Sequence, residues 1–109
     1  MIGRSRGAAL RLAAPERVLG LTESYENAQA VTLMTSLPLW ASCGAERMPL
    51  VKFPDIVETV IVFADPDPPG LIAAQKVREN NPHINVEIRS PDGEDDYAAI
   101  WQAGSVETV

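Results

Sequence analysis

The chain has 109 residues and a net charge of −6 at neutral pH, from nine basic and fifteen acidic side chains. This length is typical of one domain. No run of about 18 apolar residues occurs, so we expect no membrane span, and no signal-peptide core follows the basic N-terminus. The single cysteine, Cys43, excludes an internal disulfide and predicts a reducing, cytoplasmic location. We expect Cys43 to be a small buried residue.

The charge is distributed unevenly along the sequence. Residues 1–54 carry six basic and four acidic side chains, whereas residues 55–109 carry three basic and eleven acidic ones. Because an acidic surface repels the phosphate backbone, this composition excludes a protein that holds nucleic acid by bulk electrostatics. We therefore expect weak binding to nucleic acid unless bound cations or the basic surface of further domains assist.

The first half of the chain alternates between short apolar segments and one helical stretch. We expect residues 1–7 to form a flexible basic arm and residues 8–109 to form a single domain. Glu23 opens a predicted helix that runs to about Thr35, and residues 44–53 predict a short helix interrupted at Pro49. The apolar segments predict strands at residues 8–12, 17–22 and 38–42.

The second half contains the clearest predicted element. Residues 59–64 (TVIVFA) are continuously apolar and β-branched, which is typical of a strand covered on both faces in a parallel sheet. A turn at residues 65–70 (DPDPPG) is followed by a predicted helix at about 71–80 and by a strand at 84–88 near a sheet edge. The last predicted elements are an acidic turn at 92–96 and a short helix at 97–102. Strands that alternate with helices imply an α/β fold with a parallel sheet.

Acidic side chains follow two of the predicted strands. Glu23 ends the first buried strand, and Asp65 and Asp67 end the central one. Ligands of an open parallel sheet bind beyond the carboxyl ends of its strands. Extended residues two apart point the same way, so Asp65 and Asp67 can meet one cation, for which Mg²⁺ is suited. The same sequence also suits a tight turn, because Asp and Pro are typical turn residues, and the motif alone leaves both interpretations open.

The order of these segments resembles the Toprim domain of phage- and plasmid-type primase/helicase proteins. Residues 11–31 (RLAAPERVLGLTESYENAQAV) resemble the opening of that domain. Residues 38–74 (PLWASCGAERMPLVKFPDIVETVIVFADPDPPGLIAA) continue the resemblance through the strand that ends in D-x-D. Residues 90–101 (SPDGEDDYAAIW) are similar to its closing Pro–Gly–acid segment. The resemblance covers about residues 8–101 and implies a Rossmann-like parallel sheet flanked by helices, the Toprim fold.

The resemblance implies a role for each acidic residue. Glu23 matches the family's general acid/base in nucleotidyl transfer or strand cleavage. Asp65 and Asp67 match the two metal-binding aspartates, with Mg²⁺ or Mn²⁺ as the cofactor. Asp95 matches the acid of the closing segment and is the third expected metal ligand.

Basic and aromatic residues provide weaker signals. Arg11 and Arg17 are candidate contacts to phosphates or a nucleotide, with solvated surface charge as the alternative. Trp40 and Trp101 are expected to be core anchors rather than platforms for stacked bases.

The sequence also departs from the family pattern. Ser24 stands where the family usually has Gly, which predicts hindered approach of a ligand to that backbone, and Tyr97 and Ala98 replace the usual Asn-Asp. The sequence has no zinc-ribbon cysteines and no helicase P-loop, so we expect activity to require further domains.

The resemblance implies a Mg²⁺-dependent Toprim domain of a primase-like protein from a mobile element, which acts in DNA replication. Nucleic acid and nucleoside triphosphates are then bound with the help of additional domains, and a replication helicase is the expected partner. Whether the chain is itself an enzyme and whether it self-associates stay open. The alternatives are a Toprim-type nuclease and a non-catalytic interaction module that keeps the fold.

Overall fold

The computed structural model of the chain describes residues 9–90. The expected basic arm at residues 1–7, the acidic turn at 92–96 and the helix at 97–102 lie outside the described residues, and so do Asp95 and Trp101. Within residues 9–90, the chain forms a single layered α/β unit of one sheet and two α-helices.

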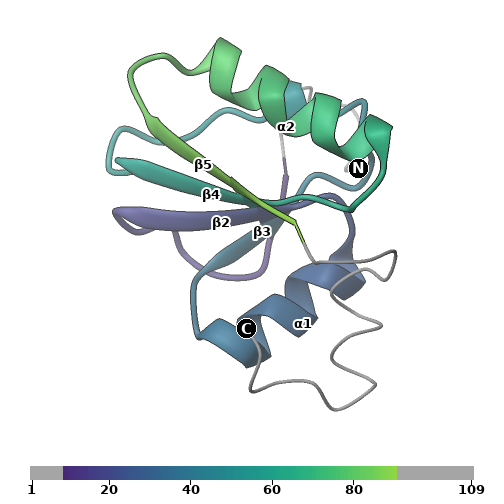
Figure 1. Cartoon of the computed structure of the whole chain (residues 1–109). Coiled ribbons are helices and arrows are strands. Elements are labelled where there is room, and N and C mark those ends of the chain that lie inside the picture. The colour runs from purple at the N-terminus through teal and green to yellow at the C-terminus, as the bar shows by residue number, and fades with distance from the viewer. Residues whose placement is uncertain (1–8, 91–109) are drawn as a thin grey trace, which may run out of the picture.

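The sheet has five strands in the order β1-β3-β2-β4-β5. Strands β2, β3, β4 and β5 run parallel to one another, and β1 pairs antiparallel with β3 at one edge. The expected α/β fold with a largely parallel sheet is therefore confirmed (Figure 1). Strand β5 lies at the other edge, as its alternating sequence predicts. The strands are β1 (Leu10–Arg11), β2 (Val18–Thr22), β3 (Leu39–Ala41), β4 (Thr59–Phe63) and β5 (Asn85–Arg89).

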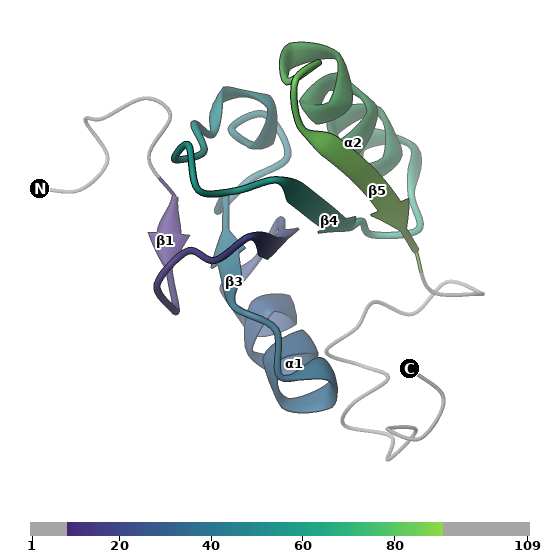
Figure 2. The same ribbon diagram turned by 90° about the vertical axis from the view of Figure 1, so that its left-hand side faces the viewer.

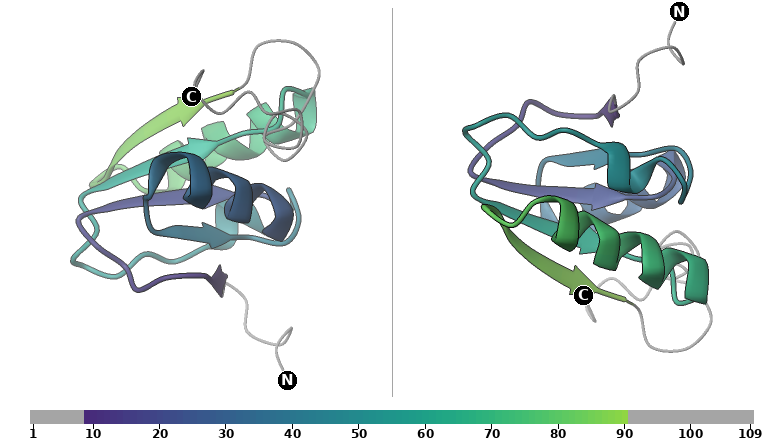
Figure 3. Two further views of the ribbon diagram at one scale, coloured as in Figure 1. Left: turned by 90° about the horizontal axis from the view of Figure 1, so that it is seen from below. Right: turned by 90° about the horizontal axis from the view of Figure 1, so that it is seen from above.

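The two α-helices cover opposite faces of the sheet. Figure 1 shows helix α1 (Tyr25–Thr35) below the strands and helix α2 (Pro68–Asn80) above them. The two views of Figure 3 show the same layers from either side, with α1 in front in one and α2 in front in the other. Each helix connects two parallel strands, since α1 joins β2 to β3 and α2 joins β4 to β5. This is the βαβ arrangement that the alternation of elements predicts.

The core consists of two apolar clusters, one on each face of the sheet. Val60 and Val62 of β4 pack in the cluster that contains residues of α2. Ile61 and Phe63 pack in the cluster that contains residues of α1. Successive strand residues point to opposite faces, so a strand buried on both faces has to be apolar throughout. The predicted double coverage of residues 59–64 is confirmed.

The start of α2 differs from the prediction. The helix begins at Pro68 rather than near residue 71, so half of the expected turn at 65–70 is helical. The Asp67 side chain accepts a hydrogen bond from the Gly70 backbone N–H and caps the helix. Proline is well tolerated in the first turn, where its missing N–H has no intrahelical partner to lose. Pro68 and Pro69 are therefore helix-starting residues here.

The segment between β3 and β4 also differs from the prediction. A 3₁₀ helix, η2 (Met48–Leu50), contains Pro49 in its first turn, so Pro49 belongs to this helix and does not interrupt it. Cys43 is exposed, although burial was expected. Both Cys43 (φ 61°) and Gly44 (φ 140°) have positive φ angles. The chain thus turns sharply just past the end of β3, and the cysteine lies outside the sheet that would have covered it.

Trp40 is a core residue, as predicted, and is fully buried on β3. Its indole N–H donates to the Ala13 carbonyl at 3.0 Å, and its ring stacks on Phe53. Figure 2 shows β1 beside β3, on the side of the sheet away from β5. Among the described residues, no helix is both long and apolar enough to span a membrane.

Candidate functional site

The carboxyl ends of β2 and β4 lie side by side. The two strands are parallel neighbours in a register that pairs Thr22 with Phe63. Glu23 follows the first strand directly, and Asp65 follows the second by two residues. The adjacency of these two strands places both acids at the edge where open α/β sheets bind ligands.

Glu23 is partly buried and surrounded by other acids. Burial raises the pKa of its carboxyl group above the ordinary value for glutamate, and the charge of Asp65, together with a hydrogen bond to it, raises this pKa further. Asp67 and Glu46 contribute smaller repulsions that act in the same direction. Desolvation and like charges both disfavour the ionised form. Glu23 therefore stays protonated at higher pH than an ordinary glutamate.

Asp65 is held by contacts from both helices. The Asn27 side-chain amide, on α1, donates to the Asp65 Oδ1 atom at 2.8 Å. Gly70, in the first turn of α2, is so close that a Cβ atom built there would lie 2.9 Å from the Asp65 carbonyl oxygen. The absence of a side chain at Gly70 lets the helix pack directly against this backbone. The Asp65 carboxylate is therefore held by α1, and α2 packs closely against the Asp65 main chain.

Asp67 has a structural task that the sequence interpretation left out. Its Oδ1 atom accepts a hydrogen bond from the Gly70 N–H at 2.7 Å as the N-cap of α2. The side chain is exposed, and its charge reaches Glu23 only as a minor repulsion. One carboxylate oxygen of Asp67 is thus committed to the helix.

Ser24, which replaces the usual glycine, adopts an ordinary extended conformation (φ −116°, ψ 157°). Its hydroxyl accepts a hydrogen bond from the Asn27 N–H and caps α1. The Glu23 carbonyl next to it accepts from the Gly44 N–H at 3.1 Å. The backbone at this position therefore needs no glycine, and the serine stabilises the helix that follows Glu23.

Two residues at this edge were missed in the sequence analysis, Asn27 and Glu46. Asn27 lies on the inner face of α1, where the helical spacing predicts an apolar residue, and this mismatch was the available signal. Glu46 follows the turn at Cys43 and Gly44, and its carboxylate oxygen would lie 3.2 Å from a Cβ atom built on Gly44. No sequence pattern indicates Glu46, because the path of this turn was not predictable.

The two candidate arginines make different contacts. The guanidinium group of Arg11 lies over the Trp40 ring, 4.3 Å from its centroid. Arg17 precedes β2 at the opposite end from Glu23 and forms an exposed ion pair with Glu58 at 3.0 Å. Arg17 and Glu23 are six residues apart along this strand, which corresponds to about 20 Å of extended chain. The structure therefore places Arg17 away from the acidic edge.

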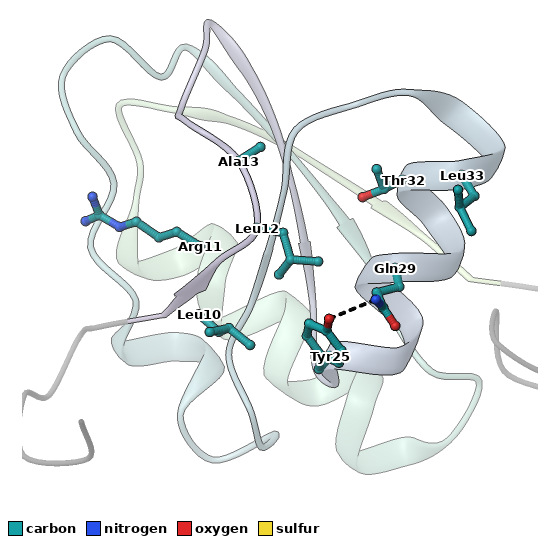
Figure 4. A pocket seen from close by; sticks show the side chains of 8 residues that line it. All are labelled: Leu10, Arg11, Leu12, Ala13, Tyr25, Gln29, Thr32 and Leu33. Carbon is teal, nitrogen blue, oxygen red and sulfur yellow. Dashed lines mark hydrogen bonds between the residues drawn. The ribbon is translucent and has the colours of Figure 1, made fainter. Parts of the chain in front are cut away.

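A separate groove of about 470 Å³ lies between the β1 segment and α1. Figure 4 shows Tyr25, Gln29 and Thr32 of α1 on the side toward Leu12, while Arg11 points away from the helix. The Gln29 amide donates to the Tyr25 hydroxyl along the α1 wall of the groove. None of the acidic residues discussed above lines it. The groove and the acidic edge are therefore distinct surfaces.

Glu23, Asp65 and Asp67 offer carboxylate oxygens at this edge, and these are ligands that Mg²⁺ and Mn²⁺ prefer. In the described part of the chain, no three or more His, Cys, Asp or Glu side chains form a complete metal cage. Mg²⁺ does not require such a cage, because it commonly binds one or two carboxylates and keeps several waters or phosphate oxygens. The interacting pair of Glu23 and Asp65 fits this kind of site.

Comparison with known proteins identifies the class. The family model for the Toprim domain matches residues 18–107, so the chain belongs to the Toprim family. The fold is similar to the crystal structure of the primase fragment of the bacteriophage T7 primase-helicase protein, with a TM-score of 0.71 and 17% sequence identity. The similarity covers 89% of this chain but only 43% of that fragment. No curated protein matches the chain significantly.

Proposed function

We propose that this chain is the Toprim domain of a primase-like protein and supports Mg²⁺- or Mn²⁺-dependent phosphodiester chemistry on nucleic acid. One observation carries the proposal, namely the direct interaction of Glu23 and Asp65 at the carboxyl ends of adjacent parallel strands. Carboxylates gathered at a ligand-binding edge repel one another, and a divalent cation bound with phosphates relieves this repulsion.

The acidic residues at this edge have different proposed roles, cation binding and proton transfer. Asp65 and the remaining oxygen of Asp67, together with Asp95, would hold the cation, which when bound neutralises charge on the phosphate groups. Glu23 is the proton-handling group, because burial and neighbouring acids raise its pKa above the ordinary glutamate value. A carboxyl group with a pKa closer to neutrality gives and accepts protons more effectively as a general acid/base.

The proposed activity requires more protein than this chain. The chain corresponds to less than half of the T7 primase fragment, and its net charge is −6. Further domains would bind the template and the nucleoside triphosphates, because an acidic domain has little affinity for phosphates. A replication helicase is the partner that suits such a protein, in the cytoplasm and on the DNA of a mobile element.

A second candidate function is a non-catalytic Toprim interaction module. One observation favours it, the groove beside α1, whose rim includes the exposed side chains of Leu10 and Leu33. A Toprim-type nuclease would use the same three acids, Glu23, Asp65 and Asp67. It would differ from a primase in the reaction and not in the site.

Parallel assays separate these functions. The protein is incubated with Mg²⁺ and either a single-stranded template with nucleoside triphosphates or a supercoiled plasmid, and Glu23→Gln is the inactive comparison. Primer synthesis supports the primase function, and nicking supports the nuclease. If Mg²⁺ binds without either reaction, the domain needs its missing partners. A chain that neither reacts nor binds Mg²⁺ is an interaction module.

A further inference from the structure

The inner face of α1 contains one buried polar residue. The buried residues of this helix are Asn27, Ala28, Ala30 and Val31, and three of these four are apolar. Asn27 is only 1% exposed. Buried polar side chains are almost always hydrogen-bonded, because a buried amide without a partner is costly. An amide at this position therefore needs a specific partner.

That partner is Asp65. The Asn27 Nδ2 atom donates to the Asp65 Oδ1 atom at 2.8 Å, across 38 residues of sequence. The amide is itself held, because the Asn27 backbone N–H donates to the capping hydroxyl of Ser24. Its position in the first turn of α1 is thus fixed by the cap that directly follows Glu23.

An amide donor suits this position in a way that other side chains do not. It holds a carboxylate without adding charge, whereas an aspartate at 27 would bring another acid next to Asp65. A carboxylate accepts several hydrogen bonds or ligands at once, so the bond from Asn27 orients the Asp65 carboxylate and leaves it acceptor capacity for a cation. Gly70 lets α2 approach the Asp65 main chain closely.

We propose that Asn27 is a positioning residue that orients the Asp65 carboxylate toward the divalent cation at the acidic edge. This inference rests on the proposed function, since it concerns the same site. Partners that hydrogen-bond to metal-binding carboxylates fix the orientation of these ligands, and their loss typically weakens metal binding about 10- to 100-fold.

The test compares Mg²⁺ affinity across matched variants of the whole chain. Asn27→Leu keeps a similar volume and removes the donor, and Asn27→Ala removes both. Asn81→Ala is the control, because the Asn81 amide also makes a part-buried hydrogen bond, to the Val77 carbonyl at the far end of α2. Calorimetric titration should show Mg²⁺ binding about 10- to 100-fold weaker in both Asn27 variants and unchanged in the Asn81 variant.

The outcomes separate this inference from the proposed function. If the wild type binds no Mg²⁺, the metal-dependent function fails and the positioning role fails with it. If the wild type binds and the Asn27 variants bind within about twofold of it, only the positioning role is overturned, and Asn27 is a purely structural residue.

A measurement on the wild type covers the case in which the variants do not fold. In magnetic resonance spectra, the side-chain amide signals of Asn27 should shift during the Mg²⁺ titration, while those of Asn81 stay in place. The dissociation constant fitted to the Asn27 shift should equal the constant for Mg²⁺ binding to the protein. An Asn27 signal that does not move at saturating Mg²⁺ overturns the positioning role.

Discussion

Mg²⁺ should stabilise the folded chain, and Asp65 should be required for this effect. A ligand that binds only the folded state adds about 1.4 kcal/mol to the free energy of unfolding at ten times its dissociation constant, and about 2.7 kcal/mol at one hundred times. One kcal/mol raises the melting temperature of a domain of this size by about 4–8 °C. Mg²⁺ at tenfold excess over the dissociation constant should therefore raise the melting temperature by about 6–11 °C.

Asp65→Asn should abolish most of this gain. The variant keeps an oxygen that can accept the hydrogen bond from Asn27, so its fold should be intact. It also removes one of the charges that repel Glu23, and the metal-free variant should be about 0.5–1 kcal/mol more stable than the metal-free wild type, a magnitude typical of partly solvated charge pairs. Asp55→Asn is the matched control, because Asp55 is exposed and lies before β4, away from the acidic edge.

Thermal melts of the three proteins, with and without Mg²⁺ at constant ionic strength, test this reasoning. The wild type and Asp55→Asn should respond alike, and Asp65→Asn should respond weakly. If the wild type gains nothing from millimolar Mg²⁺, or if Asp65→Asn gains as much as the control, the acidic edge is not a cation site.

Three further predictions concern pH, packing and nucleic acid. A raised Glu23 pKa contributes stability that is complete below the ordinary glutamate value, about 4.3, and that is lost as pH rises through the raised value. Between pH 5 and 8, the free energy of unfolding of Glu23→Gln, measured in urea, should therefore rise relative to that of the metal-free wild type. A difference between the two proteins that stays constant with pH would contradict this prediction. Gly70→Ala should cost about 1–3 kcal/mol, measured by the same unfolding, because its Cβ meets the Asp65 carbonyl; an unchanged stability would show that α2 shifts freely. The chain should bind DNA with a dissociation constant of about 10⁻⁴ M or weaker at physiological salt, and submicromolar binding without Mg²⁺ in a fluorescence titration would refute the electrostatic argument.

Most of the fold was predictable because its central strands are buried on both faces. The sequence of residues 59–64 leaves no polar face for solvent, so only a strand inside a covered sheet satisfies it. The errors occurred where local capping decides the structure. Pro68 and Pro69 suggested a turn, yet the Asp67 cap lets them begin α2. The positive φ angle of Cys43 has no sequence signature comparable to that of a glycine turn.

The candidate site was predictable in its pair of strands but not in its supporting contacts. The placement of Glu23 and Asp65 follows from the order of apolar segments, because parallel neighbours end at the same edge. The hydrogen bond from Asn27 to Asp65 depends on how α1 packs over the sheet, which is a tertiary property. The proximity of Glu46 to Glu23 depends in the same way on the turn after β3. Asp95 lies outside the described residues and stays a prediction.

The two explanations of residues 65–70 (DPDPPG), a tight turn and a cation site, require different things of Asp65 and Asp67. A helix-starting turn needs a capping oxygen, and Asp67 provides it. Such a turn does not require a carboxylate at Asp65, because this side chain points to partners on other elements, the amide of Asn27 and the carboxyl group of Glu23. The pair of Asp65 and Glu23 makes the metal-free fold less stable at neutral pH, since burial and repulsion both oppose ionisation of Glu23. Local structure therefore explains Asp67, whereas the proposed cation at the sheet edge would account for the interaction between Asp65 and Glu23.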